Sequence, residues 1–481
     1  MPSLLIASAV VRRVEALQRS RWLSPNFPFA PKRWPGFYGW VILAATTLGI
    51  LMSIPGQTAG VSIFTDHLLA ATGLSRLALS NAYLIGTLTS GLLLPLGGVF
   101  IDRVGARLVV ILSSLWLALT LVYLSLCDRL ALGLSHLLTL ASPLPVSFGL
   151  LCLGFVSLRF SGQGMLTMVS RTTLGKWFDR RRGMASGISG IFVSFGFSSA
   201  PLLLSFLIRE YVWRGGWLCL AALVGIGMGA IGWLCFRDNP EECGLVMDGA
   251  AMKAPVPELG DRPGSEASAT LTPPPQSEPY PIPTPRDFTR RQALQTLAFW
   301  AVTLALATQA LTITGITFHI VDIGAAAALS PTQTVALFLP IGIISTATGY
   351  VIGLLSDRLE LQRLFIAMMV FETIGLLGIA HLAQPLLRLV AIAGLGLTGG
   401  CFGTLSAVTM PRYFGRQQLG AIAGVEMMTL VIASAIGPSF LALCNDLFGS
   451  YQLGLYACAG LPIMVICLLI PSRNPQRETN H

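Results

Sequence analysis

The sequence is poor in charged residues. Only 11% of its 481 residues are Asp, Glu, Lys or Arg, against roughly 25% in an ordinary soluble domain. A soluble fold of this length needs more charge to cover its surface, which disfavours a soluble enzyme, a disordered chain and a coiled coil. Hydrophobic residues make up 53% of the chain and occur in long blocks. This pattern predicts an all-α membrane protein.

Several chemical motifs are also missing. The nine cysteines form no Cys-x-x-Cys pair, and most lie in apolar blocks or at their ends, as expected of small buried hydrophobic residues. The sequence has no G-x-x-x-x-G-K-[ST] phosphate loop, which disfavours transport driven by ATP hydrolysis in this chain. No His, Asp and Glu cluster has metal-ligand spacing. We therefore predict neither an enzyme nor a bound cofactor or metal.

Twelve apolar blocks are long enough to cross a hydrocarbon core, which takes about 20 helical residues. Continuous blocks of this kind are typical of helices, because barrel strands are short and alternate in character. The predicted spans cover residues 38–64, 77–101, 107–126, 144–170, 183–207, 215–236, 296–320, 332–355, 364–383, 386–410, 419–444 and 451–471.

The basic residues are divided unevenly between the loops. Of the 31 Lys and Arg residues, 25 fall in loops on the side of the two termini and five in the opposite loops. The positive-inside rule therefore places both termini in the cytoplasm, at a plasma membrane or a bacterial inner membrane. The net charge of +9 is then a topology signal, with the lipid bilayer rather than nucleic acid as the partner.

One interior segment differs from the spans. It contains the run Pro273-Pro274-Pro275 and further Pro, Ser and Glu residues, a composition typical of a flexible cytoplasmic linker. The predicted divisions are a cytoplasmic N-terminal segment at 1–37, a six-helix bundle at 38–236, the linker at 237–295, a second six-helix bundle at 296–471 and a cytoplasmic tail at 472–481.

The two bundles repeat one another. A shift of 255 residues aligns Leu74-Ser75 with Leu329-Ser330 and Asp102-Arg103 with Asp357-Arg358. Parallel six-helix repeats joined by a long loop are the layout of one large class of secondary transporter. The duplication therefore indicates transport rather than catalysis.

The loop between the second and third spans carries a recognisable motif. Gly98 to Arg107 reads G-V-F-I-D-R-V-G-A-R, which fits G-x-x-x-D-R-x-G-x-R, the loop signature of the major facilitator superfamily. A partial copy of this motif, G-L-L-S-D-R, begins at Gly353. From residue 37 on, the chain resembles this superfamily. The segments Phe37 to Trp40 and Asn239 to Leu245 are similar to its monocarboxylate and oxalate:formate branch.

The resemblance implies the major facilitator fold, with a monomer as the functional unit. It also implies that the Asp-Arg loops lock the cytoplasmic gate when the carrier faces outward. The gating residues would be Asp102, Arg103, Arg107, Asp357 and Arg358. A carboxylate at such a helix end can bind N-terminal N–H groups and nearby arginines. The alternative is a pair of charged turns that only set the topology.

Arg159 lies near the middle of the fourth span. A charge at that depth costs roughly 2.5–3.5 kcal/mol on insertion scales, so the side chain should face a wet cavity or a carboxylate. Gln163 follows one helical turn later on the same face. We predict that Arg159 is a cationic anchor for an anionic substrate or a partner in proton coupling. The alternative is a structural arginine that binds helix ends and neighbouring polar groups.

Other polar residues interrupt the spans. The resemblance implies that the first, fourth, seventh and tenth helices line the transport path. On this basis the predicted substrate-binding residues are Arg159, Gln57, Gln163, Gln309 and His319.

Two carboxyl groups lie within spans of the second bundle. Glu426 is in the eleventh span, which the resemblance places at the interface of the halves, and a buried carboxylate there could carry a proton. Glu372 is in the ninth, more peripheral span. We therefore expect its carboxyl group to hydrogen-bond a neighbouring residue or to extend toward the membrane–water interface.

These features predict a secondary active transporter for a small solute, with a small organic anion such as a monocarboxylate as the proposed substrate and a proton as the candidate coupling ion. The carboxylate branch usually has an arginine in the eighth span, and 332–355 contains none. One alternative is therefore an exporter of drug-like or other neutral or cationic solutes. Another is a non-transporting membrane sensor with the same fold, in which neutral substitutions of Arg159 and Glu426 would leave activity intact.

Overall fold

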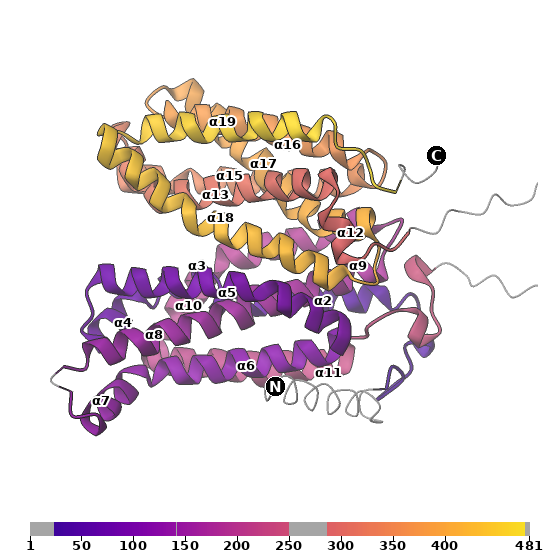
Figure 1. The fold of residues 1–481 in the computed structure, drawn as a ribbon, viewed down its shortest axis with the longest axis horizontal. Helices are drawn as coiled ribbons and strands as arrows, with labels where there is room; N and C mark the ends of the chain where they lie inside the picture. Colours follow the sequence, from indigo (N-terminus) through magenta and orange to yellow (C-terminus); the bar gives the residue numbers. More distant parts are fainter. Residues whose placement is uncertain (1–23, 141, 250–285, 477–481) are drawn as a thin grey trace, which may run out of the picture.

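The computed structural model describes residues 24–140, 142–249 and 286–476, and these residues form helices and no strands (Figure 1). Residues 237–249 and 286–295, at the two ends of the predicted linker, are described and include short helices. The rest of the predicted linker, 250–285, and part of each predicted terminal segment lie outside the described residues. From here on, the linker means residues 250–285. The helices form two bundles that lie side by side, one from each half of the chain.

The first bundle is built from residues before the linker. Its helices and short turns are η2 (Pro31–Arg33), α2 (Gly39–Met52), η3 (Ile54–Gly56), α3 (Thr58–Ser62), α4 (Thr65–Thr72), α5 (Arg76–Val104), α6 (Ala106–Ser125), α7 (Cys127–Leu137), α8 (Leu144–Leu158), η4 (Arg159–Leu166), α9 (Thr167–Trp177), α10 (Arg182–Ala222), η5 (Leu223–Met228), α11 (Gly229–Cys235), η6 (Glu241–Cys243) and η7 (Met247–Gly249).

The second bundle follows the linker. Its helices are α12 (Arg290–Leu294), α13 (Leu297–Ala326), α14 (Pro331–Ala336), α15 (Phe338–Ser356), α16 (Leu361–Ala380), α17 (Pro385–Phe414), α18 (Leu419–Phe448) and α19 (Tyr451–Leu469). Each bundle has its own apolar core, and the bundles meet where α5 packs on α18 and α10 packs on α15.

The described residues contain eleven helical stretches that are long and apolar enough to cross a membrane. One of them, Arg182–Cys235, has 54 residues and would be about 80 Å long as a straight helix, far more than a bilayer core of about 30 Å. Its backbone leaves helical geometry at Val212, with φ 59° and ψ 162°, and Gly216 then lies against the backbone of Leu207 and Ile208. This stretch is therefore a hairpin that holds the fifth and sixth spans, and the twelve-helix prediction is confirmed.

Two spans differ from straight helices. The first is broken into α2, η3 and α3 around Pro55, because proline supplies no N–H and fixes its own φ. The fourth runs through α8, η4 and α9 as far as Trp177. Its predicted end at residue 170 is wrong, and Arg171 lies within the helix rather than in a loop.

An ion pair joins the turn of this hairpin to α7, on the side of the molecule away from the Asp-Arg loops. Arg214 donates to both carboxylate oxygens of Asp128, at 2.8 and 2.7 Å, and its guanidinium lies 4.3 Å from the ring centre of Trp213. The two side chains are only 29% and 13% exposed. The hydrogen bonds from Arg214 hold the pKa of Asp128 below its ordinary value of 3.8.

We expect Asp128→Asn to destabilise the protein by roughly 1.5–3 kcal/mol at neutral pH, the range for hydrogen bonds to charged groups. A carboxyl with a lowered pKa stabilises the fold above its ordinary pKa and loses that effect as the pH falls through the lowered value. The difference in melting temperature between Asp128→Asn and the wild type should therefore disappear in strong acid. Asp66→Asn is the control, because Asp66 pairs with Arg76 while 80% exposed and should change stability little.

Candidate functional site

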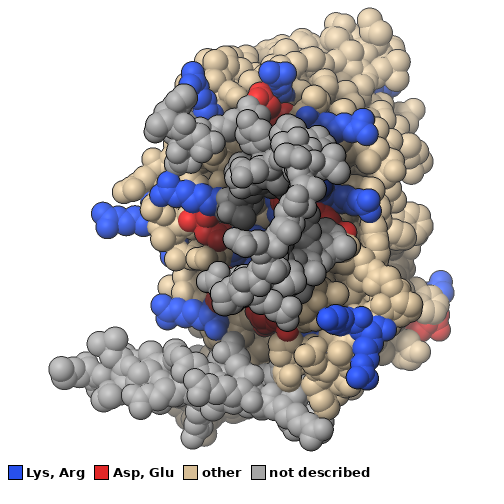
Figure 2. All heavy atoms as spheres, turned by 90° about the vertical axis from the view of Figure 1, so that its right-hand side faces the viewer, with Lys and Arg blue, Asp and Glu red and all other residues tan. Residues whose placement is uncertain are grey.

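Lys and Arg side chains gather around one end of the molecule, which Figure 2 views face on. This end carries the two Asp-Arg loops, the start of α10 and the start of α18. We call it the basic end, and we call the opposite end, where Asp128 and Arg214 lie, the far end. The hydrogen bonds that join the two bundles within the described residues all lie toward the basic end.

Asp102, near the end of α5, binds the start of α18 in the other bundle. Its carboxylate accepts hydrogen bonds from the backbone N–H groups of Gly420 at 2.9 Å and Ala421 at 2.7 Å. These N–H groups have no partner within their own helix, and a helix N-terminus favours negative charge. The helices approach so closely that a Cβ on Gly98 would lie 1.9 Å from the carbonyl oxygen of Gly420. Only glycine fits at this crossing.

Asp357 repeats the arrangement in the opposite sense. It follows α15 and accepts hydrogen bonds from the N–H groups of Gly183 at 2.8 Å and Met184 at 3.1 Å, at the start of α10. Burial raises the pKa of Asp357 above its ordinary value, although these two N–H groups oppose the shift. Each bundle thus contributes one carboxylate that caps a helix of the other. We refer to these two contacts as the Asp clamps.

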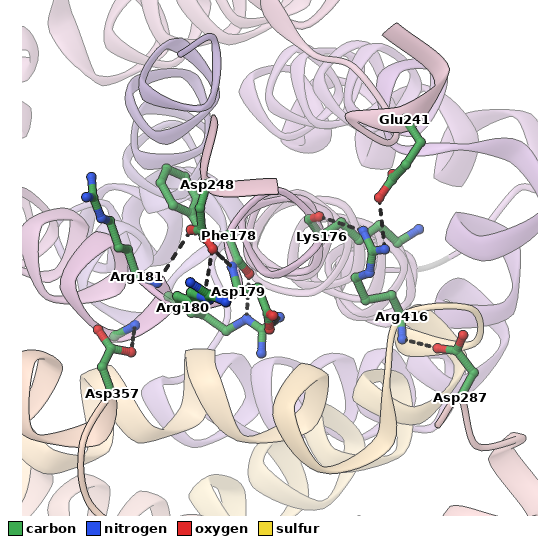
Figure 3. Close-up of polar contacts among 12 residues, drawn as sticks. Lys176, Phe178, Asp179, Arg180, Arg181, Glu241, Asp248, Asp287, Asp357 and Arg416 are labelled. Carbon is green, nitrogen blue, oxygen red and sulfur yellow. Dashed lines mark hydrogen bonds and ion pairs between the residues drawn. The ribbon is translucent and has the colours of Figure 1, made fainter. Parts of the chain in front are cut away.

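The same helix starts also bind carboxylates that flank the linker (Figure 3). Asp248 accepts hydrogen bonds from the N–H groups of residues 179, 180 and 181, the shortest being 2.7 Å, just before α10. Asp287 accepts from the N–H groups of Arg416 at 2.6 Å and Gln417 at 3.1 Å, just before α18. The sequence analysis missed both residues, because nothing local marks a contact with a loop more than 60 residues away.

Arg416 adds a further tie between the bundles. Its guanidinium donates to the carbonyl of Lys176 and to a carboxylate oxygen of Glu241, both at 3.0 Å, as Figure 3 shows. The start of α18 is therefore held to the first bundle by its backbone and by a charged side chain.

The other predicted gating residues have different surroundings. Arg107 is buried, and its guanidinium donates to the carbonyl groups of Ser24, Phe27 and Trp233. All of these lie in the first bundle, so Arg107 braces that bundle and does not join the two halves. Arg103 and Arg358 are exposed at the basic end.

Arg159 lies at the junction of α8 and η4 and is 2% exposed. Its Nη1 donates to the carbonyl of Gly56 at 3.3 Å and to Oγ1 of Thr58 at 3.4 Å. The guanidinium carbon lies 5.3 Å from the ring centre of Tyr83, and Nε has no hydrogen-bond partner in the described part of the chain. Within the described residues, no carboxylate forms an ion pair with this buried cation.

The break in the first span lies directly against this region. A Cβ on Gly56 would lie 2.7 Å from the carbonyl oxygen of Leu158 and 2.8 Å from Cα of Gly162. The adjoining Gln57 donates from Nε2 to Ser53 at 3.1 Å and to Thr167 at 3.4 Å. Arg159 and Gln57 are thus brought to the same helix crossing, and the half-buried Gln163 lies one turn further along η4.

The two predicted ligands from the seventh span lie in the second bundle. Gln309 is 6% exposed, and within residues 24–140, 142–249 and 286–476 its Oε1 has no hydrogen-bond partner. His319 lies further along α13, where Nε2 is 2.9 Å from the carbonyl of Pro438 and Nδ1 is 3.2 Å from the hydroxyl of Tyr451. These contacts occupy both ring nitrogens of His319 within the second bundle and leave none for a substrate.

The two buried carboxyl groups have unlike surroundings. Glu372 is fully buried and accepts a hydrogen bond from Thr312 at 2.6 Å, the neighbour contact that the sequence analysis allowed. Glu426 is 6% exposed and lines a small cavity between the bundles, together with Arg171 and Ser406. The sequence analysis missed Arg171, because it followed directly on the predicted span and was counted among loop charges.

Two repeated helical bundles in one membrane protein are the layout of one large class of secondary transporter. The family comparison agrees with this class, since the Major Facilitator Superfamily model matches residues 42–438 and 342–481. The chain belongs to the Major Facilitator Superfamily.

Relatives among characterised proteins place the chain near the monocarboxylate branch. It is 28% identical to monocarboxylate transporter 2 of Rattus norvegicus over 207 residues, which cover 41% of this chain and 36% of that protein. It is 23% identical to monocarboxylate transporter 1 of Bos taurus over 450 residues, which cover 88% of this chain and 82% of that protein. The match to the first of these relatives thus spans about a third of its length.

Solved structures agree on the fold. A bacterial homologue of the iron transporter ferroportin, in an outward-facing state, superposes with a TM-score of 0.62 at 16% identity, covering 89% of this chain and 98% of that one. The proton:xylose symporter XylE superposes with a TM-score of 0.58 at 14% identity, covering 90% and 95%. The predicted fold class is therefore confirmed.

Proposed function

We propose that this protein moves a small organic anion, a monocarboxylate in the first instance, across the membrane by alternating access. The observation that carries the proposal is Arg159, a buried cation without an ion-pair partner in the described part of the chain. A buried charge is costly unless it is paired. A bound carboxylate would supply the missing partner with matching two-oxygen geometry. The names of the relatives in the monocarboxylate branch support the same substrate class.

The conformation fits one state of such a cycle. The Asp clamps and Arg416 hold the bundles together at the basic end. In the proposed cycle this end is closed while the substrate enters from the far end, and the clamps open when the substrate leaves. With the basic end in the cytoplasm, as the loop charges predict, the state is outward-facing. The membrane is then a plasma membrane or a bacterial inner membrane.

Apart from His319, whose ring nitrogens both contact residues of the second bundle, the remaining predicted ligands have supporting roles in this proposal. Gln57 and Gln163 would complete the site around Arg159 from the first bundle. Gln309 would contribute from the second bundle, where its amide oxygen is buried without a partner. Glu426 would carry the proton that accompanies the anion.

A second candidate function rests on Glu426 itself. A buried carboxylate on a cavity between the bundles could instead pair with a cationic solute. The protein would then be an exporter of drug-like or other cationic or neutral solutes.

Transport assays in proteoliposomes distinguish the two functions. Labelled lactate, pyruvate, oxalate and formate are offered under a proton gradient of either sign, with a lipophilic cation in parallel vesicles. We expect at least one monocarboxylate to accumulate and to be released when the gradient is collapsed. Accumulation of the cation alone would favour the exporter, and no movement of any carboxylate would overturn the anion proposal.

A further inference from the structure

The cavity that Glu426 lines lies between the two bundles. It has a volume of about 30 Å³, room for about two water molecules. Helices α9 and α17 and the first turns of α18 enclose it. Its lining residues are Met168, Arg171, Thr172, Ser406, Ala407, Met410, Pro411, Leu419, Ala423, Glu426 and Met427.

Arg171 reaches from the first bundle to the second. It lies on α9, and its Nη1 donates to the hydroxyl of Ser406 on α17 at 3.2 Å. A neutral hydroxyl satisfies one donor of the guanidinium and none of its charge. The arginine therefore holds the bundles together while its charge stays available to another group in the cavity.

Glu426, on α18, is the group of opposite charge in this cavity. It is 6% exposed, and Oε1 has no hydrogen-bond partner among the residues that the structure describes. Arg171 is the charged group that faces it, since the other side chains around the cavity are apolar or hydroxyl-bearing. The two charges attract across the cavity without a direct ion pair among the described contacts.

The position of this pair connects it to the Asp clamps. Glu426 follows Ala421, whose N–H donates to Asp102, by five residues on the same helix, a rise of about 7.5 Å. Any movement that separates the bundles at the basic end must pull α18 away from α9. The attraction between Arg171 and Glu426 therefore opposes opening, and it acts through a low-dielectric interior where it is stronger than in water.

A proton on Glu426 changes this balance. The neutral carboxyl no longer compensates Arg171, which is left as a half-buried cation with one neutral hydrogen bond. An unpaired buried charge is destabilising, and opening would return the guanidinium to water. The protonated protein should therefore open at the basic end more readily than the ionised one.

We infer that Arg171 and Glu426 form a proton-controlled lock between the bundles, in which ionised Glu426 keeps the basic end closed and a bound proton releases it. This inference rests on the proposed alternating access. In this inference Arg171 is a positioning residue that acts on the conformational change. The proton at Glu426 controls whether the basic end opens. The inference does not depend on which solute is carried.

The test measures opening directly. Nitroxide labels are placed at Arg180 before α10 and at Leu359 after α15, both exposed at the basic end, in a variant whose nine cysteines are replaced. Electron-resonance distances between the labels are recorded in mildly acidic and mildly alkaline buffer without substrate. We expect the longer, open distances to gain population in acid.

Four substitutions test whether the pH-dependent opening depends on Arg171 and Glu426. Glu426→Gln should give the acid distribution at both pH values, and Arg171→Gln should abolish the pH-dependent shift. Arg171→Lys keeps the charge and should retain the shift, which also covers the case in which Arg171→Gln fails to fold. Glu372→Gln is the matched control for a buried carboxyl outside the cavity, and it should respond as the parent does.

The inference is overturned if Glu426→Gln keeps the pH-dependent shift of the parent, or if Glu372→Gln removes it. Because no substrate is present, this result is independent of the transport assays. A lock that responds to protons would survive a negative result with every carboxylate.

Discussion

Replacing Arg159 with Gln should reduce carboxylate uptake by about tenfold to a hundredfold. The substitution removes a charge-assisted anchor, for which losses of about 1.5–3 kcal/mol are typical. Uptake into proteoliposomes at limiting substrate is the measurement. Arg159→Lys should recover part of the activity, because lysine keeps the charge but not the two-pronged donor geometry.

The same variant separates the two interpretations of Arg159. If the arginine binds substrate, Arg159→Gln removes an uncompensated buried charge and should leave the melting temperature unchanged or higher. If the arginine is structural, the melting temperature should fall with the activity. Arg209→Gln is the control, because the Arg209 side chain is 74% exposed beside Glu210. Normal uptake by Arg159→Gln would remove Arg159 from the site.

The second large effect is expected for the double substitution Asp102→Asn with Asp357→Asn. Each asparagine keeps one acceptor oxygen but turns an N–H donor toward N–H groups that a carboxylate had satisfied. Since each clamp holds two backbone N–H groups of the opposite bundle, the closed basic end should lose several kcal/mol in total. The open population should therefore rise by at least about tenfold.

A cysteine at Thr172 reports this change, because Thr172 is 4% exposed and lines the cavity between the bundles. A charged thiol reagent applied from the basic end should label Thr172→Cys slowly in the parent and much faster in the double variant. Asp66→Asn, at the exposed pair with Arg76, should leave the labelling rate unchanged. Equal rates in the parent and the double variant would show that the clamps do not close this end.

The fold follows from sequence features that act over short distances. Apolar blocks of bilayer length, the proline at position 55 and the repeated Asp-Arg loops are each visible in a single window of sequence. The symmetric clamps could be anticipated in kind, since a carboxylate beside a helix start has few better partners. The partners themselves, Gly420 and Gly183, follow from how the two bundles pack.

The features that could not be predicted from the sequence depend on contacts between distant segments of the chain. Arg171 follows the apolar block of the fourth span and precedes a basic stretch, so composition assigned it to a loop. In the structure the helix continues to Trp177, because this last part is buried against other helices rather than exposed to lipid or water. Arg107 is an example of a residue that the sequence motif placed wrongly. The motif predicted that it lies at the gate, but its guanidinium donates to carbonyl groups within one bundle.

The central claim is that the bundles enclose a pocket around Arg159 that water reaches from one end at a time. The most direct test is labelling of a single cysteine at Gln163, one turn from Arg159, with a charged, membrane-impermeant thiol reagent in a variant that lacks the nine native cysteines. In mildly alkaline buffer without a gradient, the account predicts modification from the far end, protection by a bound carboxylate, and modification from the basic end that is slow until the Asp clamps are removed. A cysteine that no charged reagent reaches from either end, with or without the clamps, would contradict it.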